Sequence, residues 1–157
     1  MRWRLTARQV SNRGFVPDLD LPDDSMTSPA AIFFQDVVPG DRLLGPTVAV
    51  NEDEMTAFAE IWDPLPIHVD EAAGKAAFGS LTAAGIYVLA LKQRLIHQTP
   101  FGRGGVIASM GYDEVRFLKP VRPGDELTLA IDWIEKRLSK SKPDRGIVTV
   151  RLSLLDR

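Results

Sequence analysis

The chain has 157 residues, of which 45% are hydrophobic and 25% charged, as is typical of one soluble globular domain. Its net charge of −2 gives no reason to expect nucleic acid or an anionic membrane as a partner. The absence of cysteine excludes disulfides, thiolate metal sites and a cysteine nucleophile, and only two histidines disfavour a multi-histidine metal site. We therefore expect no metal and no other cofactor, and the lack of cysteine fits a reducing compartment such as the cytoplasm.

Residues 1–30 are predicted to be a poorly ordered extension that precedes a domain over residues 31–157. The segment mixes arginines with three prolines and shows no sustained period of 2 or 3.6 residues. A short strand at Arg4–Val10 is an open alternative, and Met26 is a conceivable second start. The extension lacks the apolar stretch of a secretory signal. No apolar run in the chain approaches the roughly 18 residues of a transmembrane helix.

The first part of the domain is predicted to contain a strand and then a helix. Pro39-Gly40-Asp41 and Gly45-Pro46 are turn signals, and the β-branched run Thr47–Val50 predicts a strand. Asn51 is a favourable N-cap for the helix that follows, whose first turn is acidic. The helix should pack one apolar face and deliver the chain to Asp63. This face comprises Met55, Phe58, Ala59 and Trp62.

An aspartate and a histidine, Asp63 and His68, lie five residues apart with two prolines between them. Because each proline fixes its own φ and makes the preceding residue extended, Asp63 to Ile67 is predicted to be a stiff, extended loop. Such a loop can hold two side chains at a defined separation, as an acid–base pair that shares one water requires. The alternatives are a hydrogen-bonded core histidine for His68 and an Asx turn for Asp63.

A short helix over Glu71–Ala77, capped by Asp70, is predicted next, followed by a turn at Phe78-Gly79-Ser80. The longest apolar helix of the chain then runs from Thr82, its expected N-cap, to near His97. Apolar residues surround most of its circumference in its first half, so the helix should be buried.

Gly85 falls at the third position of this predicted helix, where the backbone N–H has no intrahelical partner. A glycine inside a helix costs roughly 0.5–1 kcal/mol relative to alanine, so its presence needs a reason. One explanation is the close approach of a partly negative ligand oxygen to that N–H, which the helix dipole also favours. The other explanation is close packing against a strand.

The last third of the chain alternates apolar and polar residues in three segments, Val106–Leu118, Leu127–Trp133 and Val148–Leu154, which predicts three strands. The alternation slips near Asp113-Glu114, which indicates a bulge. Short connections between neighbouring strands make them antiparallel. One buried helix against such a sheet is an α+β architecture of the hot dog type.

These residues resemble the MaoC-like dehydratase and hydratase family, hot dog enzymes related to (R)-specific enoyl-CoA hydratase. The family signature is Asp-x-Asn-Pro-x-His, then a short helix, a Phe-Gly turn and a glycine at the start of the hot dog helix. Here it is matched by Asp63 to His68, by Phe78-Gly79 and by Gly85. The stretch DPLPIHVDE also matches one branch of the family, whose motif is Asp-Pro-x-Pro-x-His-x-Asp-Glu. The resemblance covers about Phe33 to Leu155.

The chain departs from the family pattern at three points. Leu65 stands where the signature has Asn, and the segment between His68 and Phe78 looks one residue short. The family usually has a further strand after the one at Val148–Leu154, and this chain stops at Arg157. That strand is therefore either missing, which would leave an exposed sheet edge, or replaced by an earlier segment.

The resemblance implies the reversible addition of water to a trans-2-enoyl thioester, giving a (3R)-hydroxyacyl thioester, in fatty acid metabolism. It implies that Asp63 orients and deprotonates the water, that His68 shares the proton transfer, and that the Gly85 N–H stabilises the thioester oxygen. The substrate would be carried by coenzyme A or an acyl carrier protein, and the enzyme would be a homodimer or a higher homo-oligomer.

Two other functions compete with hydration. One is a thioesterase on the same fold, which usually has an acidic residue in the central helix, whereas Ala83 to Leu91 has none. The other is a non-catalytic subunit that binds acyl thioesters, suggested by Leu65 and the short C-terminus.

Overall fold

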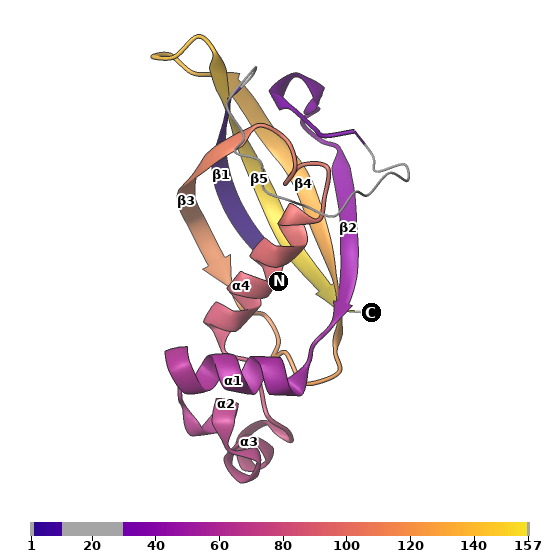
Figure 1. Ribbon diagram of the computed structural model, residues 1–157, viewed down its shortest axis with the longest axis vertical. Helices are drawn as coiled ribbons and strands as arrows, with labels where there is room; N and C mark the ends of the chain where they lie inside the picture. The colour runs from indigo at the N-terminus through magenta and orange to yellow at the C-terminus, as the bar shows by residue number, and fades with distance from the viewer. Residues whose placement is uncertain (1, 11–29, 157) are drawn as a thin grey trace, which may run out of the picture.

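The computed structural model describes residues 2–10, as backbone, and residues 30–156 (Figure 1). Four helices, one 3-10 turn and five strands are assigned in these residues. In chain order they are β1 (Arg2–Val10), η1 (Phe34–Asp36), β2 (Arg42–Ala49), α1 (Glu52–Trp62), α2 (Pro66–Val69), α3 (Glu71–Phe78), α4 (Gly85–His97), β3 (Val106–Arg116), β4 (Glu126–Leu138) and β5 (Arg145–Asp156).

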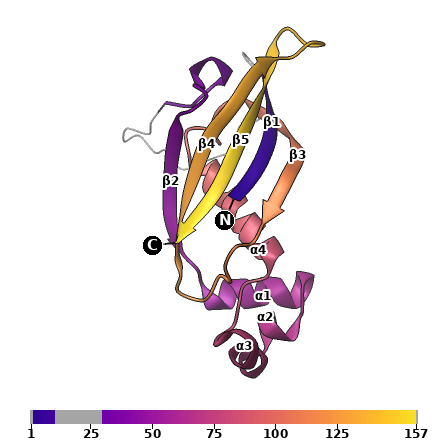
Figure 2. The same cartoon turned by 180° about the vertical axis from the view of Figure 1, so that it is seen from behind.

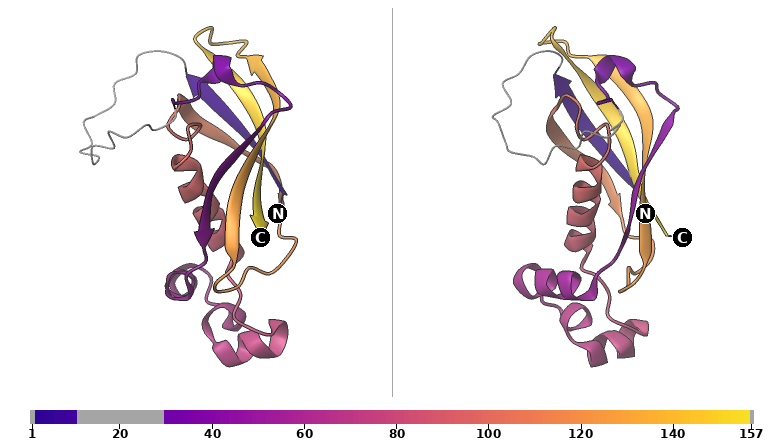
Figure 3. Two further views of the ribbon diagram at one scale, coloured as in Figure 1. Left: turned by 90° about the vertical axis from the view of Figure 1, so that its right-hand side faces the viewer. Right: turned by 45° about the vertical axis from the view of Figure 1, so that its right-hand side comes forward.

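The strands form one antiparallel sheet in the order β2-β4-β5-β1-β3. Helix α4 runs along one face of this sheet, and the three shorter helices gather beyond one end of it (Figures 2 and 3). The predicted α+β hot dog architecture is therefore confirmed, with a sheet that curves round the helix without closing. Among the described residues, no helix has both the length and the apolar content needed to cross a bilayer.

Strand β1 lies between β5 and β3 in the sheet. Its residue Trp3 lies opposite Leu152 of β5 and Val115 of β3, and it is antiparallel to both strands. An earlier segment thus takes the place of the strand expected after β5. For residues 2–10 the predicted poorly ordered extension is wrong, and the alternative of a strand at Arg4–Val10 is right. The rest of the predicted extension, residues 11–29, lies outside the described residues.

The hydrophobic core lies between α4 and the inward face of β4 and β5. The apolar residues of the alternation predicted for these two strands are buried, from Leu127 to Trp133 in β4 and from Val148 to Leu154 in β5. Burial of a Leu, Val or Ile side chain contributes about 1.5–3 kcal/mol, so this layer fixes the position of α4 and of its first turn. The central members are Leu91, Leu95, Leu129, Ile131, Val150 and Leu152, each at most 2% exposed.

Some local predictions hold and others do not. Asn51 caps α1, because its Oδ1 accepts a hydrogen bond of 2.8 Å from the Glu54 N–H. Trp62, however, is 66% exposed and does not belong to the buried face of that helix. The Gly45-Pro46 turn is also wrong, since both residues lie within β2. The pairing of β2 with β4 is irregular at this point, which lets the strand accept a residue without an N–H.

The bulge predicted near Asp113 is confirmed in β3. Arg4 of β1 pairs with Glu114 and the next residue, Leu5, pairs with Tyr112, so Asp113 is the extra residue. A bulge bends its strand and increases the local twist. The bend lies just before the end of β3, where the chain continues over the start of α4.

Candidate active site

The segment between α1 and α2 is held by backbone hydrogen bonds. Asp63 ends α1, the Leu65 N–H donates to the Asp63 carbonyl, and the His68 N–H donates to the Leu65 carbonyl, both at 2.8 Å. The Leu65 side chain is 52% exposed, so the turn is closed without the amide of the family signature. The prediction of an extended loop is wrong from Pro66 onward. Pro66 is the first residue of α2, a position that proline tolerates because its missing N–H would have no partner there.

His68 is buried, and its ring is oriented by the backbone of Thr82. The ring Nδ1 lies 2.6 Å from the Thr82 carbonyl oxygen. A carbonyl oxygen can only accept, so Nδ1 carries the proton and donates it. In the neutral ring the lone pair is then on Nε2, which lies 3.8 Å from Asp63 Oδ2. The alternative prediction, a buried and hydrogen-bonded histidine, therefore holds for Nδ1. The other nitrogen, Nε2, faces Asp63.

The separation between Asp63 and His68 suits a shared water. At 3.8 Å, Oδ2 and Nε2 are too far apart for a direct hydrogen bond. Both atoms can contact one water at about 2.8 Å from each. The Asp63 side chain is 33% exposed, so solvent reaches the pair from the carboxylate side.

The start of α4 differs from the prediction by two residues. The helix begins at Gly85 with Ala84 as its N-cap, and no side chain caps it. Thr82 does not cap this helix because its N–H donates to the Ile67 carbonyl at 3.2 Å and its hydroxyl lies 3.4 Å from His68 Nδ1. Gly85 is therefore the first helical residue instead of the third. The expectation that its N–H lacks an intrahelical acceptor still holds, because it applies to the first four residues of any helix.

The ring of Phe117 packs against Gly85. A Cβ on residue 85 would lie 2.6 Å from Phe117 Cζ, which no real side chain tolerates without movement. The packing explanation for this glycine is thus borne out by a residue that follows a strand. The close approach of a ligand to its N–H stays a prediction.

Asp63, His68 and Gly85 line one cleft of about 610 Å³, a volume in the usual range for small-molecule sites. Helix α4 forms one wall, and the segment from the end of β3 to Val121 forms the other. The two acid–base side chains occupy one polar corner, and most of the remaining lining is apolar. The apolar members are Ile67, Phe78, Ile86, Val88, Leu89, Val115, Phe117, Leu118 and Val121. Ile86 is 42% exposed here, so α4 is not buried on all sides.

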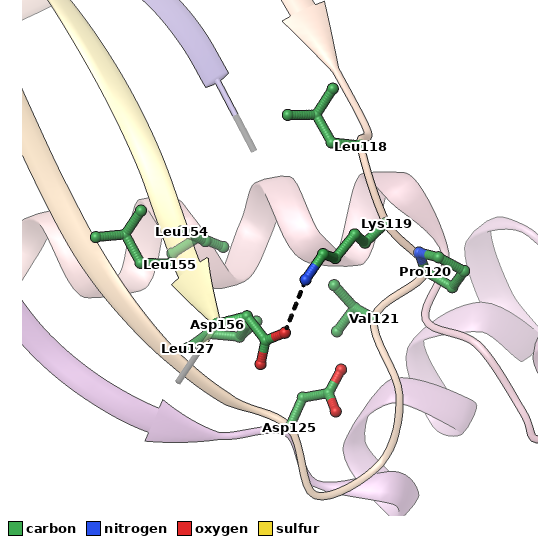
Figure 4. A pocket seen from close by; sticks show the side chains of 9 residues that line it. All are labelled: Leu118, Lys119, Pro120, Val121, Asp125, Leu127, Leu154, Leu155 and Asp156. Carbon is green, nitrogen blue, oxygen red and sulfur yellow. Dashed lines mark ion pairs between the residues drawn. The ribbon is translucent and has the colours of Figure 1, made fainter.

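A second, smaller cavity of about 220 Å³ shares the segment Leu118–Val121 with the cleft (Figure 4). Lys119 Nζ reaches across it to Asp156 Oδ2 at 3.5 Å. The shared segment is tied to the approach of α4, because the Ala83 N–H donates to the Val121 carbonyl at 2.8 Å. The wall of the larger cleft is therefore anchored close to Gly85.

Tyr87, two residues after Gly85, is a possible acid that the geometry excludes. Its ring is 2% exposed and packs edge-on against Phe58, with 5.5 Å between centroids. Burial raises the pKa of its hydroxyl, and the nearby Glu54 adds to the rise. Tyr87 is therefore neutral at physiological pH and is not among the residues that line the cleft.

Two residues of the site were not predicted from the sequence. Thr82 was assigned as a helix cap, although its carbonyl orients His68. Phe117 was read as one apolar residue of a strand, although its ring faces the glycine of the site. The sequence holds a weak signal for Phe117 alone, because it resumes the alternation just after the predicted bulge.

A sheet wrapped round one helix, with an Asp–His pair beside the first turn of that helix, is the arrangement expected for the hot dog hydratase and dehydratase family. The sequence model of the family described as "MaoC like domain" matches residues 33–154, and the chain belongs to this family.

Similar proteins agree with this assignment. The chain is 34% identical to YdeM of Bacillus subtilis (strain 168) over 108 residues, which are 68% of this chain and 75% of YdeM. It is 30% identical to protein MaoC of Klebsiella aerogenes over 112 residues, which are 70% of this chain and 33% of that protein. The crystal structure of the MaoC-like dehydratase from Rhodospirillum rubrum superposes with a TM-score of 0.74 at 34% identity. The match covers 81% of this chain and 87% of the dehydratase.

Proposed function

We propose that this chain is a hydro-lyase that adds water reversibly to a trans-2-enoyl thioester and forms a (3R)-hydroxyacyl thioester. The observation that carries the proposal is the common cleft of Asp63, His68 and Gly85, in which Asp63 Oδ2 and His68 Nε2 lie 3.8 Å apart. The family supplies the reaction class, and the resemblance of the Asp63–His68 segment supplies the stereochemistry.

The reaction needs a base for water, a proton for C2 and a donor to the thioester oxygen. The water oxygen bonds to C3 as its proton passes to the Asp63–His68 pair, and the pair delivers a proton to C2. Asp63 orients and deprotonates the water, and His68 shares the transfer through Nε2, because Nδ1 is engaged by Thr82.

The backbone N–H of Gly85 stabilises the negative charge that develops on the thioester oxygen. Its N–H is at the first turn of α4, where the helix dipole favours an anion. A single donor of this type is worth about 2.7–4 kcal/mol in the transition state. A bound acyl chain against the apolar walls of the cleft would lower the local dielectric constant and strengthen the interaction.

The proposal extends to the carrier and the assembly. We propose that the acyl group is carried by coenzyme A or an acyl carrier protein, that the protein acts in cytoplasmic fatty acid metabolism, and that it works as a homodimer. Strand β3, at the edge of the sheet beside the cleft, supports the dimer because all of its residues are exposed. Many of them are apolar, including Ile107, Met110 and Val115.

Hydration of crotonyl-CoA, followed as the loss of enoyl thioester absorbance, tests the reaction. We expect activity in the wild type, and a loss of about 10²–10⁴-fold in kcat/KM for Asp63→Asn and for His68→Gln. Asp70→Asn is a matched control, because Asp70 caps α3 outside the cleft and an asparagine can replace that cap. His97→Gln is the second control, because this exposed histidine contacts Gln93 at the far end of α4.

Other outcomes point to the competing functions. Release of free thiol from acyl-CoA would identify a thioesterase. Binding of acyl-CoA without hydration or thiol release would identify a non-catalytic subunit. An active enzyme in which the two cleft variants behave like the two controls would remove the proposed roles of Asp63 and His68.

A further inference from the structure

The ring of Phe117 occupies a defined place in the cleft. Phe117 directly follows β3 and lines the same cleft as Asp63, His68 and Gly85. A Cβ on Gly85 would lie 2.6, 2.9 and 3.0 Å from Phe117 Cζ, Cε2 and Cε1. The outer edge of the ring therefore points at the α-carbon of Gly85. Phe117 is 51% exposed and lines the cleft, so the part of the ring that does not touch Gly85 faces the space that a substrate would enter.

The backbone on both sides of Phe117 is anchored. Before it, Arg116 pairs with Arg2 of β1 as the last residue of β3. After it, the carbonyl of Val121 accepts the hydrogen bond from the Ala83 N–H, just before α4 begins. The position of the ring is thus fixed relative to Gly85 by the sheet and by the helix, and the ring does not belong to a free loop.

The ring limits the space around one carbon of the substrate. A thioester oxygen bound to the Gly85 N–H lies about 2.9 Å from that nitrogen. The nitrogen is bonded to the α-carbon that the Phe117 ring faces, at about 1.46 Å. C2 of the acyl group is two bonds from the oxygen, which keeps C2 close to the first turn of α4, in the part of the cleft that the ring lines. A flat, unbranched enoyl group would lie there between the ring and the Asp63–His68 side of the cleft, whereas a methyl group on C2 would compete with the ring for the same volume.

We propose that Phe117 is a specificity-determining residue that restricts the cleft to acyl thioesters without a branch at C2. The inference rests on the proposed function for the placement of the thioester oxygen. The substrate class is then the straight-chain trans-2-enoyl thioesters, and 2-methyl-2-enoyl thioesters are excluded.

The test compares hydration of crotonyl-CoA with that of (E)-2-methylbut-2-enoyl-CoA. One methyl group of misfit in a pocket changes kcat/KM by about 10–200-fold, so we expect the wild type to prefer the unbranched substrate by this order. Phe117→Ala should lower the ratio of kcat/KM for the unbranched to the branched substrate at least about tenfold, mainly because kcat/KM for the branched substrate rises. Phe117→Leu is a second, more conservative variant and should have an intermediate preference.

Phe33→Ala is the matched control, because it makes the same change at a partly exposed phenylalanine that does not line the cleft. This variant should keep the wild-type preference. Equal hydration of both substrates by the wild type would overturn the proposal. So would a preference that Phe117→Ala leaves unchanged, or that Phe33→Ala changes as much as Phe117→Ala does.

Binding separates this inference from the proposed reaction. Butanoyl-CoA and 2-methylpropanoyl-CoA are saturated and cannot be hydrated, so calorimetric titration measures their affinities whether or not the protein is a hydratase. Tighter binding of butanoyl-CoA by the wild type, with a reduced difference in Phe117→Ala, supports the inference even if crotonyl-CoA is not hydrated. Affinities whose ratio is the same in both proteins overturn it, even if hydration is observed.

Discussion

The carbonyl of Thr82 decides which nitrogen of His68 faces the cleft. At 2.6 Å from Nδ1 it fixes the proton there, so Nε2 is the atom available to the water and to Asp63. A backbone carbonyl performs this function, so no residue type is required and no sequence pattern reveals it. The identity of His68 as a candidate was predictable from its spacing to Asp63, whereas the state of its ring required the three-dimensional structure.

Gly85→Ala tests the contact with Phe117 directly. Within a helix alanine is favoured over glycine by roughly 0.5–1 kcal/mol, which offsets part of the cost of the displaced ring, so the melting temperature should change little. The new Cβ would lie 2.6 Å from Phe117 Cζ, so the ring or the first turn of α4 must move. Misplacement of a catalytic group by about 1 Å can cost about 10²-fold, and we expect a loss of this order in kcat/KM for crotonyl-CoA.

The double variant Gly85→Ala/Phe117→Ala is the control for this prediction. It removes the ring that the new methyl group meets, so part of the lost rate should return. A single variant with the full wild-type rate would show that the contact has no role in the site. A double variant no faster than the single one would show that the methyl group acts through the helix itself.

At the scale of elements, hydrophobic periodicity predicted α4, β4 and β5, because each of them buries one face in the same core. It failed for β1, where the apolar residues Trp3, Leu5 and Ala7 alternate with polar ones but the alternation ends at Gln9, too soon to be a sustained period. The backbone restriction of proline also misled at Pro66, because it predicts an extended loop through this residue whereas Pro66 starts α2. β1 is a strand because it pairs with two strands far away in the chain, and α2 tolerates its proline because that residue is the first of the helix. The local sequence pattern reveals neither of these conditions.

Thr6→Pro in β1 tests whether this strand joins the two parts of the sheet. Thr6 lies opposite Thr149 of β5 in the middle of the strand, and β3 is attached to the other side of β1. A proline removes an N–H from a strand that has neighbours on both sides, and leaving the opposite carbonyl without its donor should cost about 1–3 kcal/mol. Urea unfolding should show this loss of stability, and the cleft should be lost with it, because β3 leads into its wall.

Ser141→Pro is the control, since Ser141 is exposed in the loop between β4 and β5. It should unfold at the same urea concentration as the wild type. If Thr6→Pro and Ser141→Pro are equally stable, β1 does not hold β3 to the sheet.

For the molecule as a whole, the two edges of the sheet differ. β2 forms one edge and β3 the other (Figure 1). An edge strand has unpaired N–H and C=O groups, and a long, apolar one is a site for pairing with another chain. β3 is exposed throughout and lies beside the cleft, so a second copy paired with it would also cover the open side of the site.

Met110→Lys should therefore convert the proposed dimer into a monomer. Met110 is 54% exposed near the middle of β3, and a lysine there places a charge in the interface without affecting the core. Leu44→Lys is the matched control, because Leu44 is 62% exposed on the opposite edge strand β2. Size-exclusion chromatography with light scattering should find a dimer for the wild type and for Leu44→Lys, and a monomer for Met110→Lys. A monomeric wild type would contradict the dimer, and dissociation by Leu44→Lys alone would place the interface on β2. Because the cleft opens beside β3, the monomeric variant should also hydrate crotonyl-CoA more slowly than Leu44→Lys does.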